Sequence, residues 1–442
     1  MTLRGKDGHE YVEVDALGRK KRHINIDNFF EGVDNRPSLP GKNLRLTIDK
    51  DLQLSAYEAI GEKVGAVVAL KVDTGEVLAM VSKPGFDPSQ FSRGLTSKYW
   101  SSLINDSRKP LRNHTLQDHY PPGSTYKPIM ALAALEEGLF TDKTTVNCNG
   151  GFNLGRRYHC WKKYGHGKVD VYKAIRESCD VYFYKIATKL DIDVLSKYAS
   201  FFGLGQKTEI ELKREKPGLI PTREWKQKRF GKDWVKGETL SCIIGQSYVL
   251  ATPIQLAVAY AGLATGGKIY KPYVVKEVFN NSGKVEKRYK PQLVSEHSFK
   301  KENIDIIKEA LHQVPNNPKG TAWWKRGIGN DMSGKTGTSQ VTRFSSDKIY
   351  TKCTEHEYKF RHHGQFVAYA PRENPQIVVS AIVEHGCSSS KAIPLVEKVI
   401  STYMKKYHPL IHEKLALKDQ KMYKEYWRRR ALLKSKKEEE VH

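Results

Sequence analysis

The chain has 442 residues, of which 39% are hydrophobic and 28% are charged, a composition that excludes an intrinsically disordered protein. Its 74 lysines and arginines outnumber its 49 aspartates and glutamates, which gives a formal net charge of +25. Such an excess favours a polyanionic partner or simply a solvated basic surface. No sequence motif for binding RNA or DNA accompanies the charge, so we do not expect a nucleic acid partner.

The first part of the chain gives no sign of a folded core. Residues 1 to about 42 are polar and lack apolar periodicity, which predicts an extended arm or the remnant of another domain. The first eight residues are polar and form no signal peptide. The core pattern begins with an apolar segment at 44–48 and a helix-like stretch at 51–63. Two β-rich runs, 64–70 and 77–81, then flank a glycine-containing turn and predict a hairpin.

Helical patterns dominate from residue 125 to about residue 311. The longest uncharged stretch, 239–267, is long enough to span a bilayer, but it contains several polar residues. Thr252 followed by Pro253 and Gln255 is typical of the start of a soluble helix. We therefore predict a buried helix over residues 253–264 and no transmembrane segment.

A second β-rich block lies near the C-terminal end. The runs 366–370 and 377–383 flank a turn and follow a further β-rich segment at 335–341. Two early and three late antiparallel strands, with helices inserted between them, predict an α+β domain with a five-stranded sheet. From about residue 413 onward, the composition predicts a charged helical tail, which is more often solvated than a specific binding site.

The most informative stretch surrounds Ser124. Pro121, Pro122 and Gly123 predict a turn, and the apolar run after it predicts a helix that begins near Ser124. Backbone N–H groups at such a position can stabilise a developing negative charge. Lys127 lies one turn further on the same face, where a lysine in a dry pocket can take the proton of a serine nucleophile. The pattern Ser-x-x-Lys is common by chance, and alone it predicts only an N-cap and a surface charge.

Two further motifs change this balance. Ser178-Cys179-Asp180 supplies a second serine, followed by a polar side chain that can relay protons or bind a substrate amide. In the segment Lys335-Thr336-Gly337-Thr338, the glycine of a β-strand lets a ligand backbone approach, with Lys335 and Thr336 placed to bind a carboxylate. In this order the three motifs resemble those of the serine β-lactamases and penicillin-binding proteins.

Further stretches resemble the class B, monofunctional penicillin-binding proteins. They are 65–69, 74–81, Ile244-Gly245-Gln246 and 252–256. The stretch 158–167, and Asp180 where other members carry asparagine, are similar to penicillin-binding protein 2 of cell elongation. Gln246-Ser247 departs from the more usual Gln-Gly. The resemblance extends from about residue 3 to about residue 403 and implies the α+β penicillin-binding transpeptidase fold, a five-stranded antiparallel sheet flanked by helices.

The resemblance also implies a mechanism that needs no cofactor. Ser124 is expected to attack the D-Ala-D-Ala bond of a peptidoglycan stem peptide, with Lys127 as general base. Ser178, with Asp180 beside it, would pass the proton to the leaving amine. The N–H groups of Ser124 and Thr338 would form the oxyanion hole, and Lys335 and Thr336, next to Gly337, would hold the terminal carboxylate. A second stem peptide would then release the acyl-enzyme, whereas β-lactams would acylate Ser124 and leave slowly.

The same resemblance implies a domain plan and a location. Residues 1–42 would be the remnant of an N-terminal pedestal domain, 43–410 the transpeptidase domain and 411–442 the charged tail. Relatives of this kind carry an N-terminal membrane anchor. No transmembrane segment is predicted in this chain, so we expect it to lack its anchor and to act at the periplasmic face of the bacterial inner membrane. The expected partner there is a membrane glycan polymerase of the SEDS type, in cell elongation and shape maintenance.

Cysteines near the second motif suggest a metal site. Cys148, Cys160 and Cys179 lie close in sequence with His166 among them, and three thiolates and one imidazole can complete a tetrahedral structural zinc site. A metal there would fix the second motif, because Cys179 lies between Ser178 and Asp180. The alternatives are one or two disulfides among the six cysteines, or buried thiols that only pack.

Two other functions share these motifs. A β-lactamase would use the same nucleophile, but the chain is much longer than a β-lactamase domain, and we find no carboxylate placed to activate a deacylating water. A β-lactam sensor or an inactive scaffold would belong to another functional class. The complete set of Ser124, Lys127 and Lys335 argues against an inactive protein, and the transmembrane segments of a sensor are not predicted.

Overall fold

The computed structural model describes residues 3–9, 12–23, 36–342 and 351–439. The chain divides into two compact units, one formed by residues 1–47 and 273–290 and the other by residues 48–272 and 291–442. A segment from the middle of the chain therefore belongs to the same unit as the N-terminus.

The first unit is built from short antiparallel strands. One pair consists of β1 (Val12–Val14) and β2 (Lys20–His23). A three-stranded sheet has the order β12-β11-β3, with bounds Val285–Arg288, Val275–Phe279 and Asn43–Leu46. Its central carboxylate, Glu277, is almost fully buried and contacts Arg45 at 2.6 Å and Arg288 at 2.7 Å. The ion pair with Arg45 joins β3 to the hairpin of β11 and β12, which is distant in the sequence.

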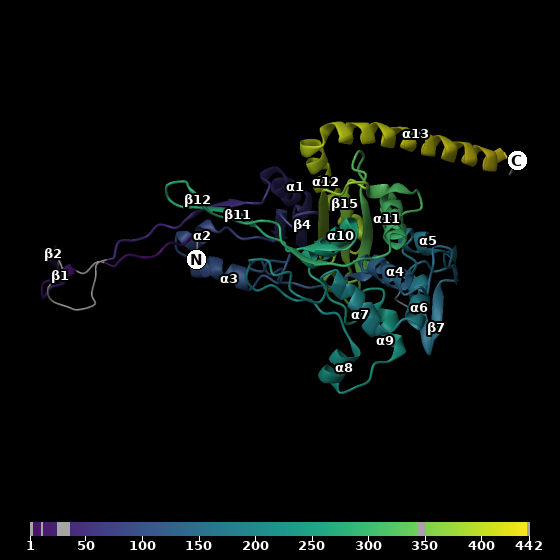
Figure 1. Ribbon diagram of the computed structural model, residues 1–442, viewed down its shortest axis with the longest axis horizontal. Helices are drawn as coiled ribbons and strands as arrows, with labels where there is room; N and C mark the ends of the chain where they lie inside the picture. Colours follow the sequence, from purple (N-terminus) through teal and green to yellow (C-terminus); the bar gives the residue numbers. More distant parts are fainter. Residues whose placement is uncertain (1–2, 10–11, 24–35, 343–350, 440–442) are drawn as a thin grey trace. The chain divides into compact units, whose positions relative to one another are not determined.

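The second unit contains a five-stranded antiparallel sheet with the order β14-β15-β16-β4-β5 (Figure 1). The strands are β4 (Gly65–Lys71), β5 (Val77–Lys83), β14 (Ser333–Ser339), β15 (His363–Ala370) and β16 (Ile377–Val383). The predicted α+β fold with two early and three late strands is confirmed. The central strands β16 and β4 are apolar and almost fully buried, whereas β14 forms one edge of the sheet.

Long helices cover the sheet. Helices α1 (Lys50–Ile60) and α12 (Ile393–Tyr407) pack against each other and against the sheet, and α11 (Lys301–Asn316) packs against β14. The predicted buried helix is confirmed as α10 (Pro253–Thr265), which packs on β4, β15 and β16. Thr252 and Gln255 cap its first turn reciprocally. Among the described residues, none of the helices combines the length and apolarity that a membrane crossing requires.

Shorter elements form a lobe beside the sheet. Its helices are α4 (Lys127–Glu136), α5 (Val171–Arg176), α6 (Asp180–Lys189), α7 (Ile192–Phe201), α8 (Arg223–Phe230) and α9 (Lys236–Cys242). Four short strands, which the helical pattern did not predict, pair as β6 (Val146–Cys148) with β9 (Gly167–Val169) and β7 (Gly151–Leu154) with β8 (Arg156–His159). The other short elements are α2 (Ser89–Ser92), α3 (Ser97–Ile104), β10 (Lys268–Tyr270), β13 (Leu293–Glu296), η3 (Trp323–Lys325), η4 (Cys353–Glu355), η5 (Tyr358–Phe360) and η6 (Ser389–Lys391).

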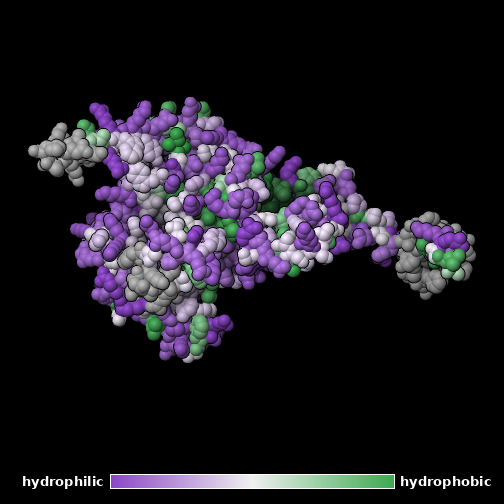
Figure 2. Space-filling view, turned by 180° about the vertical axis from the view of Figure 1, so that it is seen from behind, coloured by the Kyte–Doolittle hydropathy of each residue, from purple (hydrophilic) through white to green (hydrophobic). Residues whose placement is uncertain are grey.

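The C-terminal tail is the helix α13 (Pro409–Glu439). Much of it is exposed, but the rings of Tyr423 and Tyr426 pack against Trp323, with centroids 5.1 and 5.8 Å from that of the indole. The helix is therefore attached to the segment that leads into β14. Seen from behind, the surface of the protein is mostly hydrophilic, with hydrophobic residues in small groups (Figure 2), as the charged composition requires.

Candidate active site

Ser124 lies in a short 3-10 turn, η2 (Gly123–Thr125), immediately before α4. Gly123 adopts φ of +55°, a left-handed conformation that favours glycine. The carbonyl of Thr125 accepts a hydrogen bond from the buried hydroxyl of Tyr260 at 2.8 Å, which fixes the turn on α10. Within the part of the chain that the structure describes, the Ser124 hydroxyl makes no hydrogen bond to another group. This hydroxyl is therefore free to attack a substrate.

The buried lysine Lys127 connects the first motif to the second. Its Nζ lies 2.7 Å from Oδ1 of Asp180, 3.1 Å from the carbonyl oxygen of Ser178 and 3.4 Å from the Ser178 hydroxyl. The Lys127 side chain has no solvent-exposed surface. Burial raises the pKa of Asp180 above its usual value, and the positive charge of Lys127 opposes that rise. Lys127, Ser178 and Asp180 are therefore brought into direct contact.

The second motif is held in a strained conformation by a tryptophan. Ser178 has φ of +57°, which a residue with a side chain rarely adopts. The indole N–H of Trp161 donates to the carbonyls of Glu177 and Ser178, both at 3.1 Å, and its backbone N–H donates to Oδ2 of Asp180 at 3.0 Å. Trp161 lies in the stretch 158–167, but no spacing pattern links it to Ser178, so its role could not be predicted from the sequence.

The third motif lies on β14, at the edge of the sheet. Lys335 is fully buried, and burial together with the nearby charge of Lys127 holds its pKa well below the usual lysine value. The hydroxyl of Thr336 lies 2.7 Å from that of Thr321. A Cβ atom added to Gly337 would lie 2.8 Å from Cγ2 of Thr125, so only a glycine lets the strand lie this close to the Ser124 turn.

The three motifs therefore converge, although they lie far apart in the sequence. The Ser124 turn packs against β14, and Lys127 contacts the second motif. Lys335 lies close enough to Lys127 for that positive charge to lower its pKa. Thr338 is exposed at the edge of β14, beside Gly123. The arrangement places a free hydroxyl, buried amines and a strand edge that no other described strand covers around one point, which suits acyl transfer.

A polar network anchors the chain just before this turn. The Tyr120 hydroxyl donates to Glu384 at 2.6 Å, and Nδ1 of the buried His114 lies 2.8 Å from Asp118 and 3.3 Å from Glu384. Burial opposes protonation of His114, but its bonds to Asp118 and Glu384 outweigh burial and raise its pKa to about 9. Burial would raise the pKa of Glu384, but its bonds to His114 and Tyr120 lower it to about 2. The sequence carries no periodic signal for this network.

Gln246, which the sequence placed in a family-like stretch without a role, also reaches the site. Its Nε2 donates to the carbonyl of Thr338 at 3.1 Å. The next residue, Ser247, has φ of +63°. This left-handed conformation explains why glycine is more usual at that position in the family that the sequence resembles.

The four residues predicted to hold a metal come together. Cys148, Cys160, His166 and Cys179 are all buried, and their ligand atoms lie within 4.8 Å of one another. Nδ1 of His166 lies 3.6 Å from the sulfur of Cys148 and 3.5 Å from that of Cys160. Tetrahedral zinc with its usual bond lengths requires about 3.5 Å between a nitrogen and a sulfur ligand. The donor set and its geometry therefore fit zinc.

The backbone around this cluster is folded tightly. The His166 N–H donates to the carbonyl of Cys148 at 3.0 Å, at the end of β6. A Cβ atom on Gly165 would lie 1.9 Å from that same carbonyl, so the loop requires glycine there. Cys179 lies at the N-terminus of α6, next to Asp180. The cluster is therefore joined directly to the second motif.

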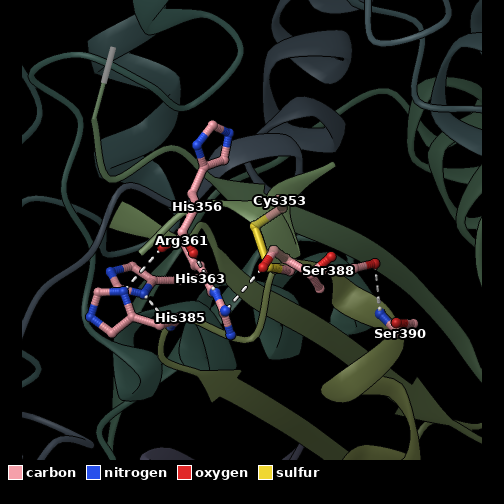
Figure 3. The surroundings of a disulfide bond; sticks show 9 residues. Cys353, His356, Arg361, His363, His385, Ser388 and Ser390 are labelled. Atoms are coloured by element: carbon pink, nitrogen blue, oxygen red, sulfur yellow. Dashed lines mark hydrogen bonds between the residues drawn. A yellow bond between two sulfur atoms is a disulfide. The ribbon is translucent and has the colours of Figure 1, made fainter. Parts of the chain in front are cut away.

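Two other cysteines form a disulfide. Cys353 and Cys387 are bonded, with Cα atoms 5.6 Å apart, and the Cys387 N–H donates to the carbonyl of His362 at 2.8 Å. Figure 3 shows His363 and His385 beside this bond, where the His385 N–H donates to Nδ1 of His363 at 2.9 Å. The sequence left open a metal site, disulfides or buried thiols, and different cysteines follow different alternatives. Four are free thiols, and only the pair outside the cluster is oxidised among the described residues.

Comparisons with known proteins agree with this site. Residues 65–403 match the family described as the penicillin binding protein transpeptidase domain. The peptidoglycan D,D-transpeptidase MrdA of Haemophilus influenzae is 37% identical over 418 residues, which are 93% of this chain and 62% of that relative. MrdA of Escherichia coli K12 is 36% identical over 409 residues, 91% of this chain and 63% of the relative. The chain thus spans less than two thirds of the length of these relatives.

Solved structures are similar over most of the chain. Pseudomonas aeruginosa PBP2 in complex with WCK 5153 has a TM-score of 0.74 and 37% identity, covering 85% of this chain and 78% of that one. The complex between PBP2 and MreC from Helicobacter pylori gives a TM-score of 0.76 and 32% identity, covering 92% and 71%. A chain from a peptidoglycan synthase complex that coordinates polymerization and crosslinking has a TM-score of 0.73 and 32% identity, covering 91% of this chain and 68% of that one.

Proposed function

Because this chain belongs to the family of penicillin-binding protein transpeptidase domains, we propose that it cross-links peptidoglycan stem peptides through an acyl-enzyme on Ser124. The observation that carries this proposal is the buried contact of Lys127 with Ser178 and Asp180, beside the turn that presents the Ser124 hydroxyl to the edge of β14. The relatives named as peptidoglycan D,D-transpeptidases support the choice of reaction.

In the acylation step, the Ser124 oxygen attacks the carbonyl carbon of the D-Ala-D-Ala bond. Its proton passes to Lys127 in the unprotonated form of that amine. The Ser178 hydroxyl, 3.4 Å from Nζ, then carries a proton to the nitrogen of the departing D-alanine, while Asp180 holds Nζ in place. The products of this step are the Ser124 ester and free D-alanine.

The edge of β14 provides the other half of the reaction. The N–H groups of Ser124 and Thr338 stabilise the negative oxygen of the tetrahedral intermediate. Lys335 and Thr336 bind the terminal carboxylate, and Gly337 lets the substrate backbone approach. An amine of a second stem peptide then attacks the ester and restores the Ser124 hydroxyl. A β-lactam acylates Ser124 in the same way, and the resulting acyl group is released slowly.

No cofactor is required for this chemistry, but we propose a structural zinc held by Cys148, Cys160, His166 and Cys179. Its role would be to fix the loop from Cys160 and the start of α6, so that Trp161 and Ser178 keep the contacts described above. The tight arrangement of sulfur and nitrogen atoms supports this assignment.

We further propose a biological setting on the basis of the family. Residues 1–42 belong to a pedestal domain, 43–410 to the transpeptidase domain and 411–442 to a charged tail. The protein works at the periplasmic face of the bacterial inner membrane, with a SEDS-type glycan polymerase as partner in cell elongation. The disulfide between Cys353 and Cys387 supports an oxidising compartment. Relatives solved with MreC and within a synthase complex support the elongation setting.

Labelling with a fluorescent penicillin tests the proposed activity. The protein and its Ser124→Ala variant are incubated with the probe and followed by gel and by intact mass over hours. A lasting adduct on the unsubstituted protein alone is the expected result. Rapid loss of the label with hydrolysis of the drug would instead identify a β-lactamase. No adduct on either protein would refute the proposal and favour an inactive scaffold protein instead.

A further inference from the structure

The side chain of Gln246 binds the open edge of β14. Its Nε2 donates to the carbonyl of Thr338 at 3.1 Å, and its Oε1 accepts the N–H of Gln340 at 3.3 Å. One amide therefore pairs with two backbone groups, one in β14 and one immediately after it, as a neighbouring strand would. Within the described residues, β14 pairs with β15 on its other side and with no strand on this one.

The backbone beside Gln246 is fixed against the Ser124 turn. The Gly123 N–H donates to the carbonyl of Gly245 at 2.8 Å, and a Cβ atom on Gly245 would lie 2.3 Å from the oxygen of Gly123. On the other side of Gln246, the ring of Tyr248 packs on Trp225 with centroids 5.0 Å apart. The backbone on both sides of Gln246 is therefore fixed, by the Ser124 turn on one side and by Trp225 on the other.

The position of this contact gives it a part in the chemistry. In an antiparallel strand, the N–H and the C=O of one residue point to the same side. The Thr338 carbonyl points to Gln246, so the Thr338 N–H also faces the open edge, beside Gly123 and Ser124. The orientation of this N–H depends on how the end of β14 is held.

We propose that Gln246 is a positioning residue for acylation, which holds the end of β14 so that the Thr338 N–H points at the oxyanion. This role rests on the proposed function, because it assumes that Thr338 supplies an oxyanion donor. Pairing with β15 runs along the whole of β14, from Ser333 to Ser339. The Gln246 contact adds a restraint only at the Thr338 end, away from the carboxylate subsite of Lys335 and Thr336. Loss of the Gln246 amide should therefore slow the chemical step while leaving substrate binding and folding unchanged.

The test is stopped-flow acylation by a fluorescent penicillin, which separates the acylation rate constant from the dissociation constant of the initial complex. Gln246→Met keeps the length of the side chain and removes both hydrogen bonds. Gln246→Glu keeps an acceptor for Gln340 and loses the donor to Thr338. Gln376→Met is the matched control, because among the described residues the side-chain amide of Gln376 bonds only to the nearby Asn374 carbonyl, in the turn between β15 and β16.

We expect both Gln246 variants to lower the acylation rate constant by roughly 10- to 100-fold, less than the direct loss of an oxyanion donor. The dissociation constant and the melting temperature should stay at the values of the Gln376→Met control. An unchanged rate constant in Gln246→Met would overturn the proposal while the proposed function stands. A parallel loss of binding and melting temperature would also overturn it, since it would show a purely structural role. Absence of acylation in the unsubstituted protein would instead refute the proposed function.

Discussion

Asp419 in α13 forms an ion pair with Arg326 at 2.8 Å, and only 14% and 3% of the two side chains are exposed. Arg326 also donates to the side chain of Asn316, whose Nδ2 donates to the carbonyl of Met332 at 2.9 Å. Met332 immediately precedes β14. Continuous polar contacts therefore join the C-terminal helix to the strand that carries Lys335.

Replacing Asp419 tests whether this attachment stabilises the fold. Asp419→Ala leaves the Arg326 guanidinium buried without its counter-charge, so we expect the free energy of unfolding to fall by about 3 kcal/mol. Urea denaturation measures the change. Asp305→Ala is the control, because the Lys301–Asp305 pair is exposed and its loss should leave the free energy of unfolding almost unchanged. Equal losses in the two variants would contradict a docked α13.

The His114 network predicts a pH-dependent stability. The pKa of His114 is raised from its ordinary 6.5 to about 9, so its contribution is complete below pH 6.5 and is lost as the pH rises through about 9. We expect unfolding free energy to fall by up to about 3 kcal/mol across this interval in the unsubstituted protein. His114→Gln should remove most of this dependence. His9→Gln, at an exposed position, should keep it, and an identical pH profile for both variants would argue against the network.

Zinc content tests the cysteine cluster. Protein purified without chelator should hold about one zinc per chain, and Cys160→Ser should hold far less, because a tetrahedral site loses one of its four ligands. The same variant should acylate more slowly, since Trp161 follows Cys160 and bonds to Asp180. Cys242→Ser, at a buried free thiol outside the cluster, is the control and should keep its metal. Well under one zinc in the unsubstituted protein would remove the assignment.

Lys335 should make substrate binding sensitive to alkaline pH. Burial lowers its pKa, so it loses its charge at a lower pH than an ordinary lysine does. We therefore expect the dissociation constant of a penicillin, which carries a carboxylate, to rise as the pH increases from neutral into the alkaline range. Lys335→Arg keeps the charge at every such pH, so the alkaline rise should be much smaller. Parallel pH profiles of the two proteins would exclude Lys335 as the carboxylate ligand.

Much of the sheet and of the candidate site was predictable from local patterns. The apolar run at 64–70 and its hairpin partner are recognisable because burial on both faces requires continuous apolar residues. Ser124, Lys127 and the strand with Lys335 carry motifs whose chemistry needs those residue types together. The helix at 253–264 was predictable from its capping residues and its apolar composition.

Contacts between distant segments were not predictable in the same way. Glu277 looks like a surface residue in the sequence, and only its pairing with Arg45 and Arg288 explains its burial. The attachment of α13 escaped detection because it depends on one aspartate and a few aromatic side chains in an otherwise solvated, charged helix. Gln246 and Trp161 act through hydrogen bonds to backbone groups, which leave no spacing signature. The cysteine count allowed disulfides but could not select Cys353 and Cys387.

The pairing of β3 with β11 has a consequence for biosynthesis. Arg45 and Glu277 are separated by 232 residues, so the chain cannot complete this small sheet until the distant hairpin has been synthesised. At ordinary translation speeds, this interval lasts roughly 10 to 50 s. The delay is longer still for the main sheet, in which Val68 of β4 pairs with Ser380 of β16. A nascent chain therefore carries exposed apolar strands for most of its synthesis, and its need for chaperones should be greatest just before β16 emerges.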